Sequence, residues 1–352
     1  MQKLLTIVIP AYNMEAYLSR CVSSLLTLAN AELQQTEIII VNDGSTDGTL
    51  AIAQNFQSQW PEIVRVIDKE NGNYGSCVNC GLANAQGLYI KILDVDDSFA
   101  PEAYQQFVSR LQTADVDLVV TEFCKVDSDG IELETSHFCE GDNGQIHTTL
   151  DTFRPLLQMH ALCYRTEMLR EHGYEQTTGI SYTDTEWVIL PMLYVRRFVC
   201  WPMPLYRYLI GREGQTMDAE ILFRKHEQLI TTLAKCIQWI NSERRCGHSS
   251  HYVEGRLCYT ISFLYYTILV DNGAWECPAL IDFDQCLYRE ASYAYHHLES
   301  SILADGSQFH FVQAWRQNHY HAPQMPLSKR VRAFVHRCKV HLQWRWSNLF
   351  SR

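Results

Sequence analysis

The stretch Glu37-Ile38-Ile39-Ile40-Val41-Asn42-Asp43-Gly44-Ser45 runs from an apolar strand into a polar turn, and a helical pattern over 46–57 follows it. An almost unbroken apolar run is typical of a parallel strand that is buried on both faces of its sheet. Asn, Asp, Gly and Ser are turn formers that end such a strand. This strand–turn–helix unit predicts an α/β domain with a parallel sheet.

The same unit recurs through the first third of the chain. Further apolar runs predict strands at 6–9, 64–67, 89–93 and 118–120. Helical patterns predict helices that begin at Asn13 as a capping residue and that cover 74–85 and 101–111. Right-handed crossovers would then give a Rossmann-like, mostly parallel sheet flanked by helices.

Length and patterning divide the chain into three parts. The 352 residues correspond to about two domains. We expect an α/β domain over 1–212, a helical domain over 213–320 and a basic amphipathic tail over 321–352. The helical region is predicted from apolar residues that share one face, namely Leu222, Leu229, Leu233 and Ile237.

The charge is acidic overall but basic at the C-terminus. The chain has 29 Lys and Arg against 40 Asp and Glu, which argues against nucleic acid as a partner. Segment 328–350 combines basic residues with Trp and Phe. Two interpretations of this segment stay open: peripheral contact with an anionic membrane surface, or packing on the acidic α/β domain.

Targeting signals are missing from the sequence. We find neither a signal-peptide pattern nor an apolar stretch of about 20 residues. The 13 cysteines are therefore interpreted as free thiols in a reducing compartment. We expect a cytoplasmic protein, peripheral on the inner face of the plasma membrane if the tail binds lipid. A lone C-x-x-C motif, Cys77 to Cys80, does not predict a zinc site.

Polar residues follow each predicted strand. They lie in the segments 10–15, 42–45, 68–75 and 94–97, and the last contains three carboxylates. The carboxyl ends of parallel strands share one edge, where ligands bind. Neither a dinucleotide-binding glycine motif nor a phosphate-binding lysine loop is present. Clustered carboxylates repel one another unless a divalent cation neutralises them, which suits a nucleotide diphosphate ligand.

Four motifs in order then make the chain resemble a known family. They are Ile-Val-Ile-Pro-Ala-Tyr-Asn-x-Glu, Val-Asn-Asp-Gly-Ser-Thr-Asp-Gly-Thr, Asn-Gly-x-x-Gly-Ser and Leu-Asp-x-Asp-Asp, and the segment 181–186 extends the match. The chain is similar to family 2 glycosyltransferases of the GT-A fold, of the non-processive bacterial type. This resemblance implies inverting transfer of one sugar from a nucleotide-diphosphate sugar, with UDP-sugars favoured, to a hydroxyl of a glycan or lipid-linked acceptor. The expected setting is cell-surface polysaccharide or glycoconjugate synthesis.

The resemblance also implies roles for individual residues. Asp184 would be the catalytic base, and Asp96 would ligate Mg²⁺ or Mn²⁺. Tyr12 would stack on the base, and Asp43 would accept a hydrogen bond from it. The nucleotide would be bound by residues of the first four motifs, together with one residue between them: Pro10, Ala11, Tyr12, Asn13, Glu15, Asp43, Asn71, Gly75, Asn79, Asp94 and Val95.

Several residues carry a structural alternative or depart from the family pattern. Asp97 is interpreted as the cap of the helix that follows it. Thr183 and Glu186 have the spacing of a capping box, which would make Asp184 a first-turn acid. Val78 stands where an arginine often contacts phosphate, and Lys69 or Lys91 would have to replace that arginine. His160 near the acceptor region is interpreted as structural.

A second function stays open beside the enzyme. A module with the same fold could bind a sugar nucleotide or glycan without turnover. The presence of Asp94, Asp96 and Asp184 argues for the enzyme, because a silent module does not need all three.

Overall fold

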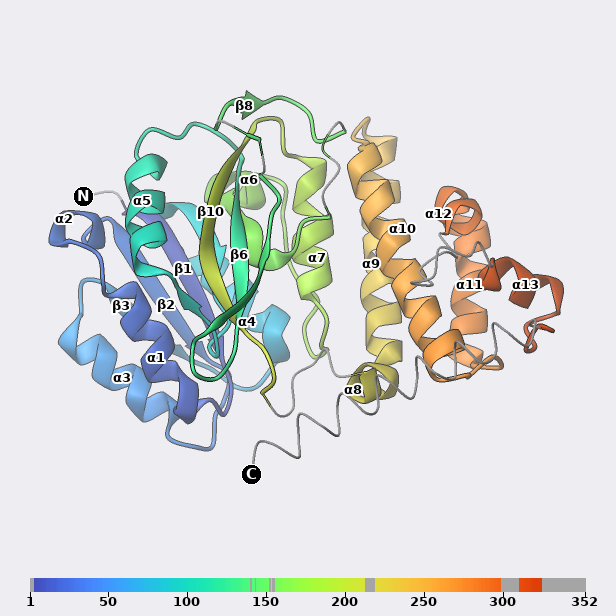
Figure 1. The fold of residues 1–352 in the computed structure, drawn as a ribbon, viewed down its shortest axis with the longest axis horizontal. Coiled ribbons are helices and arrows are strands. Elements are labelled where there is room, and N and C mark those ends of the chain that lie inside the picture. The colour runs from blue at the N-terminus through green and yellow to red at the C-terminus, as the bar shows by residue number, and fades with distance from the viewer. Residues whose placement is uncertain are drawn as a thin grey trace. The chain divides into compact units, whose positions relative to one another are not determined.

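The computed structural model describes residues 3–139, 141–142, 144–151, 153, 156–212, 219–298 and 310–324 (Figure 1). The chain divides into two compact units. One consists of Met1–Arg212 with Cys246–Tyr252, and the other of Glu213–Arg245 with Val253–Arg352. Most of the basic tail predicted over 321–352, including all of 328–350, lies outside the described residues.

The first unit is built on a ten-stranded sheet among the described residues, with the order β3-β2-β1-β4-β9-β6-β10-β5 and with β7 and β8 on β6 and β10. The strands are β1 (Lys3–Ala11), β2 (Thr36–Asn42), β3 (Val64–Asp68), β4 (Gly87–Ile92), β5 (Ser98–Phe99), β6 (Leu118–Val126), β7 (Glu132–Ser136), β8 (Ile146–His147), β9 (Leu162–Arg165) and β10 (Phe198–Leu209). The five strands expected from the sequence are β1, β2, β3, β4 and β6. The prediction of an α/β sheet is thus confirmed.

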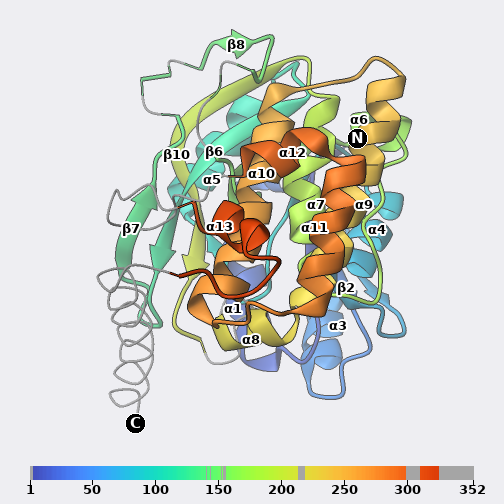
Figure 2. The ribbon, with the colours of Figure 1, turned by 90° about the vertical axis from the view of Figure 1, so that its right-hand side faces the viewer.

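Most residues that pair between neighbouring strands belong to parallel pairs. These pairs are β1 with β2 and β4, β2 with β3, and β6 with β10. The short strand β9 lies antiparallel between β4 and β6 and joins the two parallel parts. Figure 2 shows β7 on the outer side of β6, where it pairs antiparallel. The sheet is therefore mostly parallel, with antiparallel additions in its second half.

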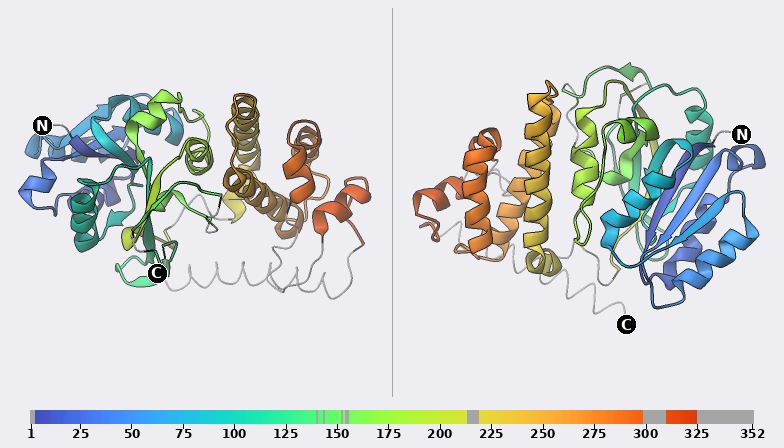
Figure 3. Two further views of the ribbon diagram at one scale, coloured as in Figure 1. Left: turned by 90° about the horizontal axis from the view of Figure 1, so that it is seen from above. Right: turned by 180° about the vertical axis from the view of Figure 1, so that it is seen from behind.

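Helices cover both faces of this sheet (Figure 3). Helix α4 contacts β1 and β2, whereas α5 contacts β1 and β10. The helices of this unit are α1 (Glu15–Leu25), α2 (Asn30–Leu33), α3 (Thr49–Gln59), α4 (Asn73–Asn84), α5 (Pro101–Leu111), α6 (Thr166–Glu171) and α7 (Asp184–Ile189), with 3₁₀ turns at Met159–Ala161 and Pro191–Leu193. The strand residues Ile38 to Val41 are completely buried, as expected for a strand covered on both faces.

The second unit is helical. Its helices are α8 (Ala219–Arg224), α9 (His226–Arg245), α10 (His251–Tyr265, whose first two residues belong to the first unit), α11 (Pro278–Glu290), α12 (Ser292–His297) and α13 (Phe311–Gln317), with a π turn at Tyr266–Asp271. The predicted apolar face is buried at Leu222, Leu229, Leu233 and Ile237. Within the described ranges, no helix has the length and apolarity that crossing a bilayer needs.

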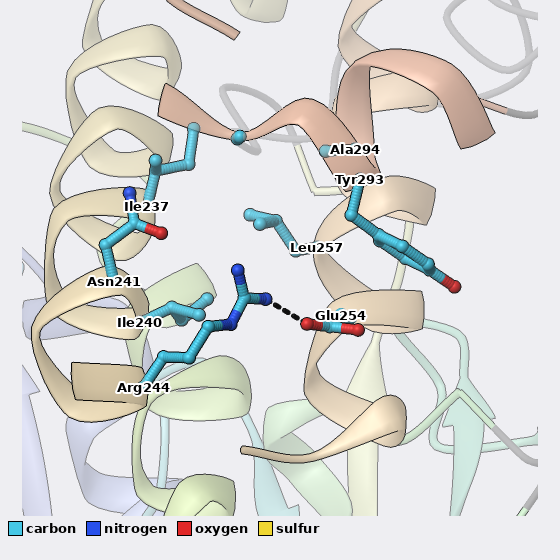
Figure 4. Close-up of a pocket in the computed structure, with 9 residues that line it drawn as sticks. Ile237, Ile240, Asn241, Arg244, Glu254, Leu257, Tyr293 and Ala294 are labelled. Carbon is cyan, nitrogen blue, oxygen red and sulfur yellow. Dashed lines mark hydrogen bonds and ion pairs between the residues drawn. The ribbon is translucent and has the colours of Figure 1, made fainter. Parts of the chain in front are cut away.

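A pocket lies between α9, α10 and α12 of the second unit (Figure 4). Its apolar lining includes Ile237, Ile240 and Leu257. Arg244 and Glu254 form an ion pair in its wall, and Tyr293 stands beside them. None of these residues was predicted to have a functional role.

Candidate active site

The predicted nucleotide residues at the end of β1 hold the next loop in place. Pro10 and Ala11 are buried, whereas the Tyr12 side chain is 49% exposed. Asn13 has a left-handed φ of 52°, and its Oδ1 accepts a hydrogen bond from Thr46 N–H at 2.8 Å. Asn13 therefore does not cap α1, which begins at Glu15 after Met14. The capping prediction was wrong, because the Asn13 side chain binds a loop instead of its own helix.

Glu15 supports the same loop. Its Oε2 accepts a hydrogen bond from Gly48 N–H at 2.6 Å, and its own N–H donates to Asp47 at 3.1 Å. The first two motifs are thus joined by hydrogen bonds between main chain and side chain. Tyr12 remains the exposed aromatic residue beside this joined pair of loops.

Asp43, at the end of β2, is buried and ion-paired. Its Oδ1 lies 2.6 Å from Lys69 Nζ and accepts a hydrogen bond from Gly72 N–H at 3.0 Å. The Asn71 side chain donates to the main-chain oxygen of Asp43 at 3.0 Å. Lys69 therefore fixes Asp43 and connects the second motif to the third.

Gly75 and Asn79 connect α4 to the segment before α7. A Cβ atom at Gly75 would lie 2.1 Å from the carbonyl oxygen of Thr177, so only glycine allows this approach. The Asn79 side chain exchanges two hydrogen bonds with the main chain of Gln176, at 2.8 and 2.7 Å. Both residues thus contact the chain that leads to Asp184.

Asp94 follows β4 and is surrounded by other acids. Tyr74 donates its hydroxyl hydrogen to Asp94 Oδ1 at 2.8 Å. Burial, followed by the charges of Asp96 and Asp184, raises the pKa of Asp94 to about 7, although the Tyr74 hydrogen bond opposes this rise. The charges of Asp96, from the same loop, and of Asp184, from the start of α7, therefore both act on Asp94.

Asp96 and Asp97 face different partners. Asp96, beside the buried Val95, lies 2.8 Å from Arg212 Nε through its Oδ2 atom. Asp97 is completely buried and accepts hydrogen bonds from Tyr206 at 2.6 Å and from Leu209 N–H at 2.7 Å. Asp97 does not cap α5, whose capping residue is Ala100. That prediction was wrong, because Asp97 ties the loop to β10.

Asp184 is the first residue of α7 and is partly buried. Glu186 does not form the predicted capping box with Thr183, whose side chain makes no capping bond. Glu186 is completely buried and accepts hydrogen bonds from Thr177 N–H at 2.8 Å and from the Thr177 hydroxyl at 2.6 Å. The start of α7 is thus held by Thr177, the residue that approaches Gly75.

His160 and Lys91 are both buried. One ligand atom each from Asp94, Asp97 and His160 lie within 4.8 Å of one another, so these residues form a candidate cation group. Among the described residues, the buried Nδ1 of His160 has no hydrogen-bond partner. Lys91 is completely buried and donates to the carbonyl oxygens of His160 and Leu162. Lys91 therefore cannot replace the missing phosphate-contacting arginine.

Sequence reasoning missed three site residues: Tyr74, Tyr206 and Arg212. Tyr74 lies inside the third motif, next to Gly75, so its place in the motif was a usable signal. Tyr206 and Arg212 follow no motif and reach the loop only because β10 joins the sheet.

The first part of the chain matches a known protein family. Residues 6–177 match the model described as Glycosyl transferase family 2. An uncharacterized glycosyltransferase of Mycoplasma pneumoniae is 34% identical over 168 residues, which are 47% of this chain and 54% of that protein. A chondroitin synthase of Pasteurella multocida is 40% identical over 102 residues, 29% of this chain and 10% of the synthase. The chain thus spans about half the length of one relative and a tenth of the other.

A solved structure shares the fold. S. aureus TarS 1–349, crystallised with UDP-GlcNAc, superposes with a TM-score of 0.67 at 18% identity, covering 97% of this chain and 92% of TarS. The expected GT-A architecture is thereby confirmed. The region 6–177, just under half of the chain, therefore belongs to the family 2 glycosyltransferases.

Proposed function

We propose that the protein transfers a single sugar, with inversion, from a nucleotide-diphosphate sugar to a hydroxyl group of a glycan or lipid-linked acceptor. A UDP-sugar is the favoured donor, because TarS, which shares the fold, was crystallised with UDP-GlcNAc. The likeness to a chondroitin synthase supports a place in cell-surface polysaccharide or glycoconjugate synthesis.

The observation that carries this proposal is the meeting of carboxylates from distant parts of the chain. Burial and the charges of Asp97, Asp94, Asp96 and Asp184 raise the pKa of Tyr208 to about 12. Three of these carboxylates lie in the loop after β4 and the fourth at the start of α7, so charges from two distant parts of the chain act on the same hydroxyl. Such a cluster is costly unless it holds a positively charged or proton-donating ligand.

Asp184 is the proposed catalytic base. Inversion in one displacement needs a base that takes the proton of the acceptor hydroxyl while that oxygen attacks the anomeric carbon. The bond from this carbon to the diphosphate oxygen breaks in the same step. The Thr177–Glu186 hydrogen bonds fix the start of α7, and this supports a defined position for the Asp184 carboxylate.

The donor nucleotide is proposed to lie along the ends of β1, β2 and β4. The exposed ring of Tyr12 offers a stacking surface for the base. Asp43 is proposed to accept a hydrogen bond from the base while Lys69 and Gly72 hold it. The remaining proposed nucleotide residues shape this edge, either by holding its loops or by lining it: Pro10, Ala11, Asn13, Glu15, Asn71, Gly75, Asn79, Asp94 and Val95.

The donor atoms at this edge fit Mg²⁺ or Mn²⁺. Carboxylate oxygens are the ligands that Mg²⁺ prefers, and an imidazole such as His160 also suits transition metals. Asp96 is the proposed ligand, and Asp94, Asp97 and His160 form the nearby group of possible donors. When bound, the metal would neutralise charge on the departing diphosphate.

A donor screen tests the proposal. The purified chain is incubated with single UDP- and GDP-sugars, an acceptor extract and Mn²⁺ or Mg²⁺, and released nucleoside diphosphate is measured. We expect release with at least one donor, loss of release with a chelator, and one added sugar of inverted anomeric configuration by mass spectrometry and NMR. Donor binding without release by the wild type would instead identify a silent binding module.

Two variants test the residue roles. Asp184→Asn should lose about 10²–10⁴-fold in turnover while still binding UDP. Asp96→Ala should lose both turnover and metal-dependent UDP binding. The matched control is Asp129→Asn, because Asp129 is an exposed acid in the turn before β7. Full activity of either site variant would overturn the role given to that residue.

A further inference from the structure

Asp96, the proposed metal ligand, is already bound to a cation of the protein. Arg212 Nε lies 2.8 Å from Asp96 Oδ2, and the two side chains are only 19% and 11% exposed. The Arg212 guanidinium also lies over the ring of Tyr17, 5.6 Å from its centroid. A second arginine, Arg20, donates to the main-chain oxygen of Asp96 and leaves the carboxylate to Arg212. The ion pair is thus a built contact and not a chance surface pair.

The backbone near Arg212 is fastened to the carboxylate loop by other bonds. Asp97 accepts a hydrogen bond from Leu209 N–H, three residues before Arg212, and this bond is buried. Tyr206, on the same strand, donates to Asp97 and accepts from Asp94 N–H. Breaking the Asp96–Arg212 pair therefore would not carry the chain at Leu209 away from the loop. The guanidinium would stay within side-chain reach of the site.

A divalent cation and a guanidinium compete for Asp96. A divalent cation bound through Asp96 Oδ2 would compete with Arg212 Nε for that oxygen, because two cations held at one carboxylate oxygen repel each other. The donor brings a diphosphate, and guanidinium binds phosphate oxygens through paired hydrogen bonds. The displaced arginine would thus bind the diphosphate when it loses the Asp96 carboxylate.

We infer that Arg212 acts as an exchangeable counter-ion: it neutralises Asp96 before the metal binds and moves to the donor diphosphate afterwards. This inference rests on the proposed function, because it takes Asp96 as the metal ligand. It makes Arg212 a donor-binding residue that also disfavours metal binding without donor. Metal and nucleotide should therefore bind with positive coupling. The metal releases Arg212 from Asp96, so that Arg212 can bind the diphosphate, and the diphosphate binds Arg212, so that Asp96 can bind the metal.

Binding of Mn²⁺ measured without turnover tests the exchange. Free Mn²⁺ is followed by electron paramagnetic resonance in the full chain, with and without UDP. We expect Arg212→Gln to bind Mn²⁺ alone about 3- to 10-fold more tightly than the wild type, because the competing cation is gone. In the presence of Mn²⁺, the same variant should bind UDP about 10-fold more weakly, because the diphosphate loses its guanidinium.

Matched variants separate the possible outcomes. Arg207→Gln removes an arginine of β10, the strand that ends shortly before Arg212. Its ion-pair partner is Glu132, and the change should leave both affinities unchanged. Arg212→Lys keeps the positive charge but cannot form paired hydrogen bonds. Its affinity for Mn²⁺ alone should therefore equal that of the wild type, whereas its affinity for UDP should be lower. Circular dichroism checks the fold of each variant.

The result that would overturn the inference is an unchanged Mn²⁺ affinity in Arg212→Gln while Asp96→Asn weakens Mn²⁺ binding. Unchanged UDP affinity in Arg212→Gln would likewise refute the transfer to diphosphate. Failure of the proposed metal role is seen separately, because Asp96→Asn would then bind Mn²⁺ as the wild type does. In that last case the inference falls together with the role of Asp96.

Discussion

The hydroxyl of Tyr206 lies 2.6 Å from Asp97 Oδ2 and also accepts a hydrogen bond from Asp94 N–H at 3.1 Å. One buried hydroxyl therefore connects β10 to both ends of the Asp94–Asp97 loop. Tyr206→Phe would leave two buried polar groups without their partner. We expect the free energy of unfolding to fall by about 1–3 kcal/mol, measured by urea denaturation.

Tyr208→Phe is the control for this prediction. It removes a hydroxyl two residues along the same strand, and no hydrogen bond of this hydroxyl occurs among the described residues. We expect a change below about 0.5 kcal/mol. Equal losses in the two variants would contradict the importance of the Tyr206 hydrogen bonds.

The Asp43–Lys69 pair is expected to act as one unit in donor binding. Lys69→Met leaves the buried Asp43 carboxylate without its cation, and we expect UDP affinity to fall about 10-fold by calorimetry. Asp43→Asn should weaken UDP binding by a similar factor. The double variant should lose less than the product of the two factors, because both changes break one contact.

Lys125→Met provides the matched control, since Lys125 pairs with the exposed Glu134 in the same unit. Its UDP affinity should equal that of the wild type. Strictly multiplicative losses in the Asp43 and Lys69 variants would show that the pair does not act as a unit.

Gly75 and Gly255 are both helical glycines, and alanine should affect them in opposite directions. At Gly75 a Cβ would meet the Thr177 carbonyl oxygen at 2.1 Å, so Gly75→Ala should destabilise the protein by about 1–3 kcal/mol. At Gly255 nothing lies within 4 Å of the added atom, so Gly255→Ala should stabilise by about 0.5–1 kcal/mol. Thermal unfolding of both variants measures the signs, and a stabilising Gly75→Ala would refute the close approach.

His160 predicts a loss of stability in mild acid. Burial, followed by the charge of Lys91, lowers the pKa of His160 from 6.5 to about 3. Between these values the unfolded chain binds a proton that the native protein does not, so this contribution to stability falls as the pH decreases. Between pH 7 and pH 5 we expect a loss of about 2 kcal/mol relative to His160→Phe, which cannot titrate.

Urea denaturation of wild type and His160→Phe at both pH values measures this difference. Replacing the imidazole by a phenyl ring also changes the free energy of unfolding by an amount that does not depend on pH. This amount cancels, because only the change between the two pH values is compared. Parallel pH profiles of the two proteins would show that His160 does not resist protonation.

Asp284 holds the second unit together. It is completely buried and receives hydrogen bonds from Arg316 at 2.6 Å and from Tyr265 at 2.7 Å. Asp284→Asn removes the charge that balances Arg316, and we expect a loss of about 3–5 kcal/mol in urea denaturation. Asp282→Asn, an exposed acid on the same helix, should change stability by less than about 0.5 kcal/mol. Similar effects of the two variants would contradict the prediction.

The first half of the sheet could be predicted because its signals are local. An apolar run such as 38–41 is buried whichever strands become its neighbours, and a polar turn marks where it ends. The antiparallel strand β9 was not predicted. It has only four residues, and its position between β4 and β6 depends on pairing with distant chain.

Local rules failed where a side chain had a better partner far away. Asn13 and Asp97 have the residue types of helix caps, yet Asn13 binds Thr46 and Asp97 binds Tyr206 and Leu209. Thr183 and Glu186 have capping-box spacing, but Glu186 binds Thr177. A capping pattern shows which hydrogen bonds a side chain is able to accept. The folded structure decides which donor lies close enough to form one.

The sequence by itself determined the parallel α/β start of the chain and the edge of the sheet where the acids stand, because strand periodicity and turn residues act over a few neighbouring positions. Only the tertiary structure decided that Arg212 forms an ion pair with Asp96 and that Tyr206 donates a hydrogen bond to Asp97. It also decided that the charge of Asp184 raises the pKa of Asp94. These partners are separated by about ninety residues or more, and no local pattern encodes their distance. They meet because β10 pairs with β6 and because Thr177 holds the start of α7, and both contacts form only when the whole sheet is assembled.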